Sequence, residues 1–102
     1  MYNIGRRSRM TENDLILLAE EVVEKLKKSN TTLAVAESCT GGWLSKILTE
    51  ISGVSAIYQG GVCSYSNNVK MKVLGVREET LKAYGAVSSQ TAEEMANGVR
   101  KA

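Results

Sequence analysis

A short apolar run that ends in a glycine-containing turn, and is followed by a helical pattern, constrains the fold of this chain more than any other feature. The run spans residues 32–37, the turn is Ser38–Gly42, and Trp43 begins the helical pattern. A strand, a glycine turn and a helix in this order are typical of turns that bind phosphate or present a nucleophile. In open α/β sheets such turns border the crevice where ligands bind. We therefore expect an α/β fold with a ligand site after the first strand.

The regions on either side of this unit predict one further helix and one further strand. Thr11 and Asp14 form a capping box, and apolar residues then recur at helical spacing as far as Lys28. Residues 56–65 form a second apolar run, which contains a pair of glycines that marks a bulge or a close approach. The chain therefore continues the alternation of helix and strand.

Three helical patterns follow the second strand, over residues 68–74 and 77–84 and after a cap at Ser88. Alternating helices and strands favour a layered α/β/α fold with a mostly parallel sheet. Two strands are marginal on their own, so we expect the N-terminal portion of a larger α/β domain and a protomer that forms a homo-oligomer. The polar and basic residues 1–10 predict a tail that precedes a domain of residues 11–102.

The residue types that are missing exclude several kinds of chemistry. The chain of 102 residues contains no histidine, and its two cysteines, Cys39 and Cys63, form no CxxC pair. Serine–histidine pairs, cysteine–histidine pairs and histidine-ligated metals are therefore excluded, and we expect no metal centre. A catalytic base in this chain has to be a lysine, glutamate, aspartate, tyrosine or cysteine.

The charge distribution argues against a folded surface that binds nucleic acid. Lysine and arginine number 13 against 11 acidic residues, but Arg6, Arg7 and Arg9 lie in the predicted tail, so the remainder is slightly acidic. No apolar run approaches the roughly 20 residues of a membrane-spanning helix, and a secretory apolar segment is missing. We therefore expect a cytoplasmic protein without a membrane partner.

The turn Ser38–Gly42 has a functional and a structural interpretation. In the first, Ser38 is a nucleophile, and backbone N–H groups at the helix start hold an oxyanion or a phosphate. In the second, Ser38 or Thr40 caps the helix and the glycines permit a tight turn. The turn matches neither GxGxxG nor the Walker pattern, so the residues leave both interpretations open. Strand alternation predicts that Cys39 points away from Ser38 and is buried.

A second polar segment, Tyr65–Lys70, follows the second strand. If the two strands are parallel neighbours, this segment opens on the same edge of the sheet as Ser38. A lysine in a desolvated cleft can serve as the general base to a serine, whereas most lysines are solvated. The nearby carboxylate of Glu37 would either orient the lysine or accept hydrogen bonds that fix the turn.

Five segments share their order and spacing with a known family: Ala36–Gly42, Gly60–Val62, Tyr65–Lys70, Leu74–Leu81 and Gly85–Ser88. They resemble the C-terminal domain of the CinA (competence/damage-inducible) family, which includes bacterial nicotinamide-nucleotide amidases. The similarity runs from about Leu15 to the end of the chain.

The resemblance implies hydrolysis of the carboxamide of nicotinamide mononucleotide to nicotinate mononucleotide and ammonia, in pyridine-nucleotide salvage. It implies that Ser38 is the nucleophile, that Lys70 is the base and that Tyr65 orients the pair or the substrate ring. No cofactor is implied. The residues implied to contact the substrate are Glu37, Thr40, Gly41, Gly42, Ser66 and Asn67.

The resemblance also implies further strands and a glycine- and proline-rich loop after the last helix. This sequence contains no proline and no such loop. A second hypothesis is therefore a CinA-like nucleotide-binding or oligomerisation module that lacks catalysis because part of its pocket is missing.

Overall fold

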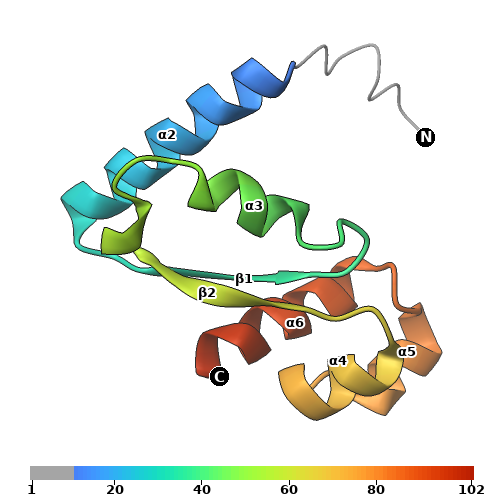
Figure 1. Ribbon diagram of the computed structural model, residues 1–102. Helices are drawn as coiled ribbons and strands as arrows, with labels where there is room; N and C mark the ends of the chain where they lie inside the picture. The colour runs from blue at the N-terminus through green and yellow to red at the C-terminus, as the bar shows by residue number, and fades with distance from the viewer. Residues whose placement is uncertain (1–10) are drawn as a thin grey trace.

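The computed structural model describes residues 11–102, and the predicted tail of residues 1–10 lies outside the described part. The expected layered α/β/α architecture with a parallel sheet is confirmed (Figure 1). The elements occur along the chain in the following order: α2 (Glu12–Ser29), β1 (Leu33–Glu37), α3 (Trp43–Thr49), the 3₁₀ turn η1 (Val54–Ala56), β2 (Tyr58–Cys63), α4 (Asn67–Leu74), α5 (Glu78–Tyr84) and α6 (Ser89–Lys101).

Helix α2 begins at the predicted capping box. The Thr11 hydroxyl accepts a hydrogen bond from the Asp14 N–H at 3.1 Å, and the Asp14 carboxylate accepts one from the Thr11 N–H at 2.9 Å. These two bonds satisfy two of the N–H groups that a helix start leaves without partners. The helix ends at Asn30, which adopts the left-handed conformation at φ 57°. None of the described helices is both long and apolar enough to cross a bilayer.

The sheet consists of β1 and β2, which pair in parallel. The register is irregular where Leu33 pairs with Tyr58 and Ala34 pairs with Gly60, because Gln59 is an extra residue in β2. Within residues 11–102 each strand has one paired edge and one unpaired edge. The predicted second strand began at residue 56, but this was wrong, since residues 54–56 form η1 and β2 starts two residues later.

Helices cover both faces of the sheet (Figure 1). On one face α2 and α3 enclose a core of Ala19, Val23, Val35, Ile47, Leu48, Ile51, Val54 and Ile57. On the other face α4, α5 and α6 enclose a smaller core of Leu74, Val76, Met95 and Val99. Alternation along β1 explains this division, because Val35 belongs to the first core while Ala34 and Ala36 pack against the second. The two cores fix both strands and the turns that follow them.

A close approach of two backbones holds α4 against α6. A Cβ atom on Gly98 would overlap the Leu74 carbonyl oxygen and lie 2.6 Å from the Leu74 carbonyl carbon. Only glycine leaves room for this approach. The crossing places α4, which carries Lys70, firmly on the second core.

Candidate active site

The carboxyl ends of β1 and β2 meet at one edge of the sheet, as the parallel pairing requires. Glu37, the last residue of β1, is in register with Cys63, the last residue of β2. The Ser64 N–H donates to the Glu37 carbonyl oxygen at 2.8 Å, so the two backbone segments stay paired for one residue beyond the strands. Ser38 and the segment that leads to Lys70 therefore leave the sheet side by side.

The turn Ser38–Gly42 leads into α3 without a side-chain cap from its own residues. Gly41 and Gly42 adopt φ values of 64° and 95°, which favour glycine, and Gly42 occupies the N-cap position. The interpretation of Ser38 or Thr40 as the helix cap was therefore wrong. Among residues 11–102 the Ser38 hydroxyl makes no hydrogen bond, and the side chain is half-buried.

Glu37 supplies the cap that the turn lacks. Its Oε1 accepts from the Thr40 hydroxyl and the Leu44 N–H, both at 2.7 Å. Its Oε2 accepts from the Ser45 N–H at 3.1 Å and from the Ser45 hydroxyl at 2.6 Å. The Glu37 residue is only 5% exposed. Of the two roles expected for this carboxylate, the structure shows the one that fixes the turn.

Four hydrogen bonds favour the ionised form of Glu37. Burial alone would raise the pKa of this carboxyl, but the bonds from Ser45, Thr40 and the backbone N–H groups hold its pKa below the ordinary value of 4.5. The Glu37 carboxylate therefore already binds the N–H groups of Leu44 and Ser45. These N–H groups at the start of α3 would otherwise attract an anion. Only the N–H groups earlier in the turn are left for a ligand oxygen.

Lys70 is among the most deeply buried side chains of residues 11–102, at 1% exposure. Its Nζ donates to the carbonyl oxygens of Ser64 at 3.3 Å and Tyr65 at 3.2 Å. No carboxylate forms an ion pair with it within residues 11–102. The alternative of a solvated helix lysine was therefore wrong. The described hydrogen bonds do not join Lys70 to Ser38, although both residues follow adjacent strand ends.

A cavity of about 380 Å³ lies beside Ser38 on the α6 side of the sheet. Its polar lining comes from Ser38, Thr40 and Ser88 together with Glu37. The remaining lining residues are Ala34, Ala36, Cys39, Leu44, Ala86, Val87, Ala92, Met95, Ala96 and Val99. A mainly apolar cavity with a few convergent polar groups is the usual form of a small-molecule site.

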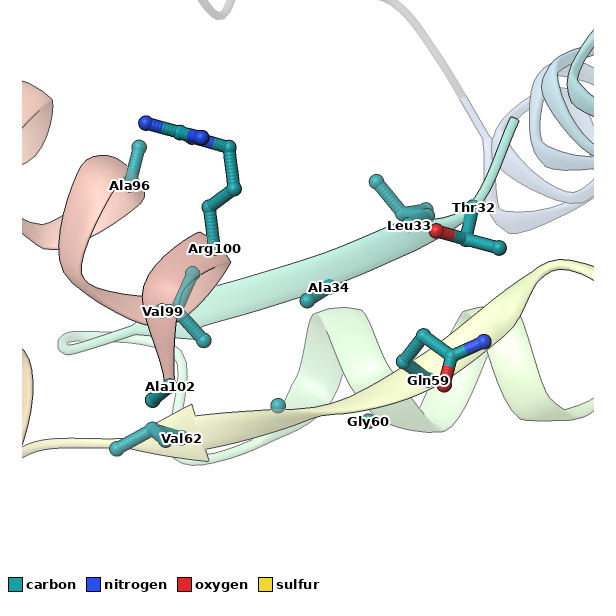
Figure 2. Close-up of a pocket in the computed structure, with 11 residues that line it drawn as sticks. Thr32, Leu33, Ala34, Gln59, Gly60, Val62, Ala96, Val99, Arg100 and Ala102 are labelled. Atoms are coloured by element: carbon teal, nitrogen blue, oxygen red, sulfur yellow. The ribbon is translucent and has the colours of Figure 1, made fainter.

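A larger hollow of about 760 Å³ lies further along the same face of the sheet, against the last turns of α6 (Figure 2). Its walls are Ala34 and Gly60 from the strands and Val99, Arg100 and Ala102 from the end of the chain. Neither Ser38 nor Lys70 lines it. Of the two cavities, only the smaller one is lined by Ser38, and Lys70 lines neither.

The second turn carries one cap residue and one exposed aromatic ring. The Ser66 hydroxyl accepts from the Val69 N–H at 3.1 Å and caps α4, and Asn67 is the first residue of that helix. Tyr65 is 91% exposed, and only its backbone carbonyl contacts Lys70. The phenol hydroxyl makes no hydrogen bond in the described part of the chain.

One expectation about packing near the turn was wrong. Cys39 is exposed, because the strand ends at Glu37 and strand alternation does not continue into the turn. Trp43 and Leu44 belong to neither core of residues 11–102 and are exposed at 45% and 41%. Residues 11–102 contain no cluster of acidic residues and cysteines that could hold a metal ion.

Sequence reasoning missed two residues that complete the Glu37 network. Ser45 lies one turn into α3, and the Tyr58 hydroxyl donates to the Ser45 hydroxyl at 2.9 Å. Ser45 is one of three polar residues in α3, beside Lys46 and Thr49, so the sequence contains no distinct signal of this contact.

Comparison with known proteins identifies the family. Residues 16–102 match the CinA C-terminal domain. The chain is 58% identical over 83 residues to a CinA-like protein of Nostoc punctiforme, and the aligned segment covers 81% of this chain and 20% of that protein. It is 48% identical over 93 residues to the nicotinamide-nucleotide amidohydrolase PncC of Escherichia coli K12, and the aligned segment covers 91% of this chain and 56% of that protein.

The fold agrees with a solved structure of the same group. A crystal structure of a competence-damaged protein (CinA) superfamily protein from Escherichia coli superposes with a TM-score of 0.85 at 33% identity, over 99% of this chain and 60% of that one. The chain thus spans little more than half the length of PncC and of this structure, and a fifth of the Nostoc protein. The match over residues 16–102 shows that the chain belongs to the CinA C-terminal domain family.

Proposed function

We propose that this chain carries the catalytic residues of an amidase that hydrolyses the carboxamide of nicotinamide mononucleotide. The observation that carries the proposal is a serine hydroxyl that makes no hydrogen bond within residues 11–102 and lines a cavity, at the end of a strand whose paired neighbour leads to a buried lysine. The similarity of this chain to PncC, which is named a nicotinamide-nucleotide amidohydrolase, supports the choice of substrate.

In the proposed reaction Ser38 Oγ attacks the carboxamide carbon, and the neutral amine of Lys70 takes the hydroxyl proton. The tetrahedral intermediate collapses when Lys70 returns that proton to the departing ammonia. Water then attacks the acyl-enzyme, Lys70 takes its proton, and Ser38 leaves with a proton from Lys70. The products are nicotinate mononucleotide and the free enzyme, so all atoms and protons are accounted for.

The two carbonyl groups beside Lys70 support its role as the base. A neutral amine has two N–H donors and one lone pair. If both donors remain on the carbonyl oxygens of Ser64 and Tyr65, the amine is fixed and its lone pair stays available for a proton.

The N–H groups of Thr40, Gly41 and Gly42 are the proposed donors to the oxyanion or to the substrate phosphate. None of them donates a hydrogen bond within residues 11–102. Donors that are already held in place stabilise the developing charge without reorganisation. We propose Ser66, Asn67 and the exposed ring of Tyr65 as further contacts to the substrate, which would lie between the two turns.

A nucleotide-binding module without turnover is the second candidate. The lack of a hydrogen bond between Ser38 and Lys70 favours it, although such bonds are often long before substrate binds. A homo-oligomer is proposed with either function, since within residues 11–102 both strands of the sheet have an unpaired edge.

Ammonia release from nicotinamide mononucleotide tests the proposal. We expect turnover by the chain, loss of turnover in Ser38→Ala and Lys70→Ala, and unchanged turnover in Lys72→Ala, which alters an exposed lysine of the same helix. Turnover that survives Ser38→Ala would contradict the assignment of the nucleophile. A rise in melting temperature with the nucleotide, without ammonia, would favour the second candidate.

A further inference from the structure

We propose that Glu37 is a positioning residue, whose buried carboxylate fixes the backbone that presents Ser38. The role in catalysis rests on the proposed function, whereas the restraint on the turn does not. Glu37 lies at the end of β1, directly before Ser38, and has no contact with the reacting atoms in this proposal. It acts through the turn and the start of α3.

The carboxylate joins the turn to the helix at three residues. Oε1 accepts from Thr40 and Leu44, and Oε2 accepts twice from Ser45. Only Ser38 and Cys39 lie between Glu37 and Thr40, so the backbone of Ser38 is restrained on both sides. The Ser38 hydroxyl takes no part in this network and stays available for chemistry.

The turn has little else to hold it. Gly41 and Gly42 lack side chains and have more backbone freedom than any other residue type. Two backbone bonds involve the turn, from the Trp43 N–H to the Thr40 carbonyl at 3.2 Å and from the Lys46 N–H to the Gly42 carbonyl at 3.0 Å. The side-chain restraint comes from Glu37, which holds Thr40 in the turn directly and fixes the start of α3 that follows it.

Residues of β2 also contact the hydrogen-bond network around Glu37. Tyr58 of β2 donates to the Ser45 hydroxyl at 2.9 Å. A Cβ atom on Gly61 would lie 2.7 Å from Val35 Cγ2 and 3.1 Å from Ser45 Oγ, so β2 leaves no free space next to the network. The Glu37 network is therefore enclosed on the β2 side.

Glu37→Gln tests the role with a minimal change in shape. A glutamine amide has one acceptor oxygen, and its NH₂ group would face N–H and O–H donors, so the bonds to one side of the carboxylate are lost. A displacement of about 1 Å at a reacting group costs roughly 100-fold in rate. We expect kcat to fall about 100-fold and KM to change by much less.

Glu94→Gln is the matched control. The Glu94 carboxylate accepts from the Arg77 N–H at 2.9 Å and from the Thr80 hydroxyl at 2.6 Å, so it joins α6 to the start of α5 in the same way. Glu94 lies in α6, on the face of the sheet opposite α3, and although α6 lines the cavity beside Ser38, Glu94 is not one of the lining residues. We expect Glu94→Gln to leave the kcat per folded molecule unchanged.

The decisive measurement is amide hydrogen exchange in residues 38–42, read beside ammonia release well below the melting temperature. Faster exchange at these amides in Glu37→Gln alone, with the fall in kcat, supports the proposal. Exchange like that of the unchanged protein, or an equal fall in kcat in Glu94→Gln, overturns it.

Two further readouts keep the proposal separate from the proposed function. If the unchanged chain releases no ammonia, the amidase proposal fails, and hydrogen exchange together with the labelling rate of Ser38 by a fluorophosphonate still decides the role of Glu37. If Glu37→Gln does not fold, Thr40→Val removes a single donor from an exposed residue. That variant is expected to speed exchange in the turn, and unchanged exchange there would contradict the proposal.

Discussion

Replacing Gly98 by alanine sets two effects of opposite sign against each other. In a helix interior alanine is favoured over glycine by about 1 kcal/mol, so propensity alone predicts a more stable protein. The structure predicts the reverse, because the new Cβ would overlap the Leu74 carbonyl oxygen and lie 2.6 Å from the carbonyl carbon. Packed carbon atoms lie at roughly 3.5 to 4 Å, so α6 and α4 have to separate by about 1 Å or more.

The separation would open the second core. Leu74 and Val99, which are 2% and 9% exposed, lie on the two helices concerned. Overpacking typically costs about 1 to 3 kcal/mol and occasionally more. We expect a net loss of about 2 kcal/mol in the free energy of unfolding, or a melting temperature lower by roughly 8 to 16 °C for a domain of this size.

Thermal unfolding followed by circular dichroism, with urea unfolding as a second probe, measures this loss. Asn97→Ala is the control, since it changes an exposed neighbour in the same helix and is expected to be neutral or slightly stabilising. A Gly98→Ala protein that melts at or above the temperature of the unchanged protein would refute the reasoning, because helix propensity would then outweigh the contact.

Three further predictions concern stability. The lowered pKa of Glu37 means that the folded protein binds fewer protons there than the unfolded chain, so the stability contributed by Glu37 is complete above the ordinary pKa of 4.5 and is lost as pH falls through the lower folded value. Between pH 6 and pH 3 the melting temperature should therefore fall more steeply for the unchanged protein than for Glu37→Gln, and parallel curves would contradict this. Ser88→Ala removes the acceptor of the Thr91 N–H at the start of α6 and should cost about 1 kcal/mol in urea unfolding, with no change as the opposing result. Lys25→Ala breaks an exposed ion pair with Glu21 and should alter stability by less than about 0.5 kcal/mol, whereas a larger loss would show that the pair matters.

Features that depend on neighbours in the sequence were predictable. The capping box at Thr11 and the cap at Ser88 both use partners three residues away, and each is present. Strand and helix alternation was sufficient to predict a parallel pair with both turns on one edge.

Features that depend on packing between elements were not predictable. The donors to Glu37 lie up to eight residues away on a different element, so its role depended on how α3 sits on the sheet. The same holds for Glu94, whose partners are 14 and 17 residues away. The burial of Lys70 likewise follows from the position of α4 on the second core, while the exposure of Cys39 follows from the end of β1.

The unpaired edges of the sheet have a consequence for behaviour in solution. In residues 11–102, β1 and β2 each bond to one neighbour, so each presents a row of backbone N–H and C=O groups along its other side. Such rows are templates on which an extended segment of another molecule can add as a strand. Short strands of five and six residues limit how many bonds each template offers. The apparent molecular mass of this chain, measured by light scattering, should therefore rise with protein concentration. A short extended peptide that covers an edge should suppress the rise.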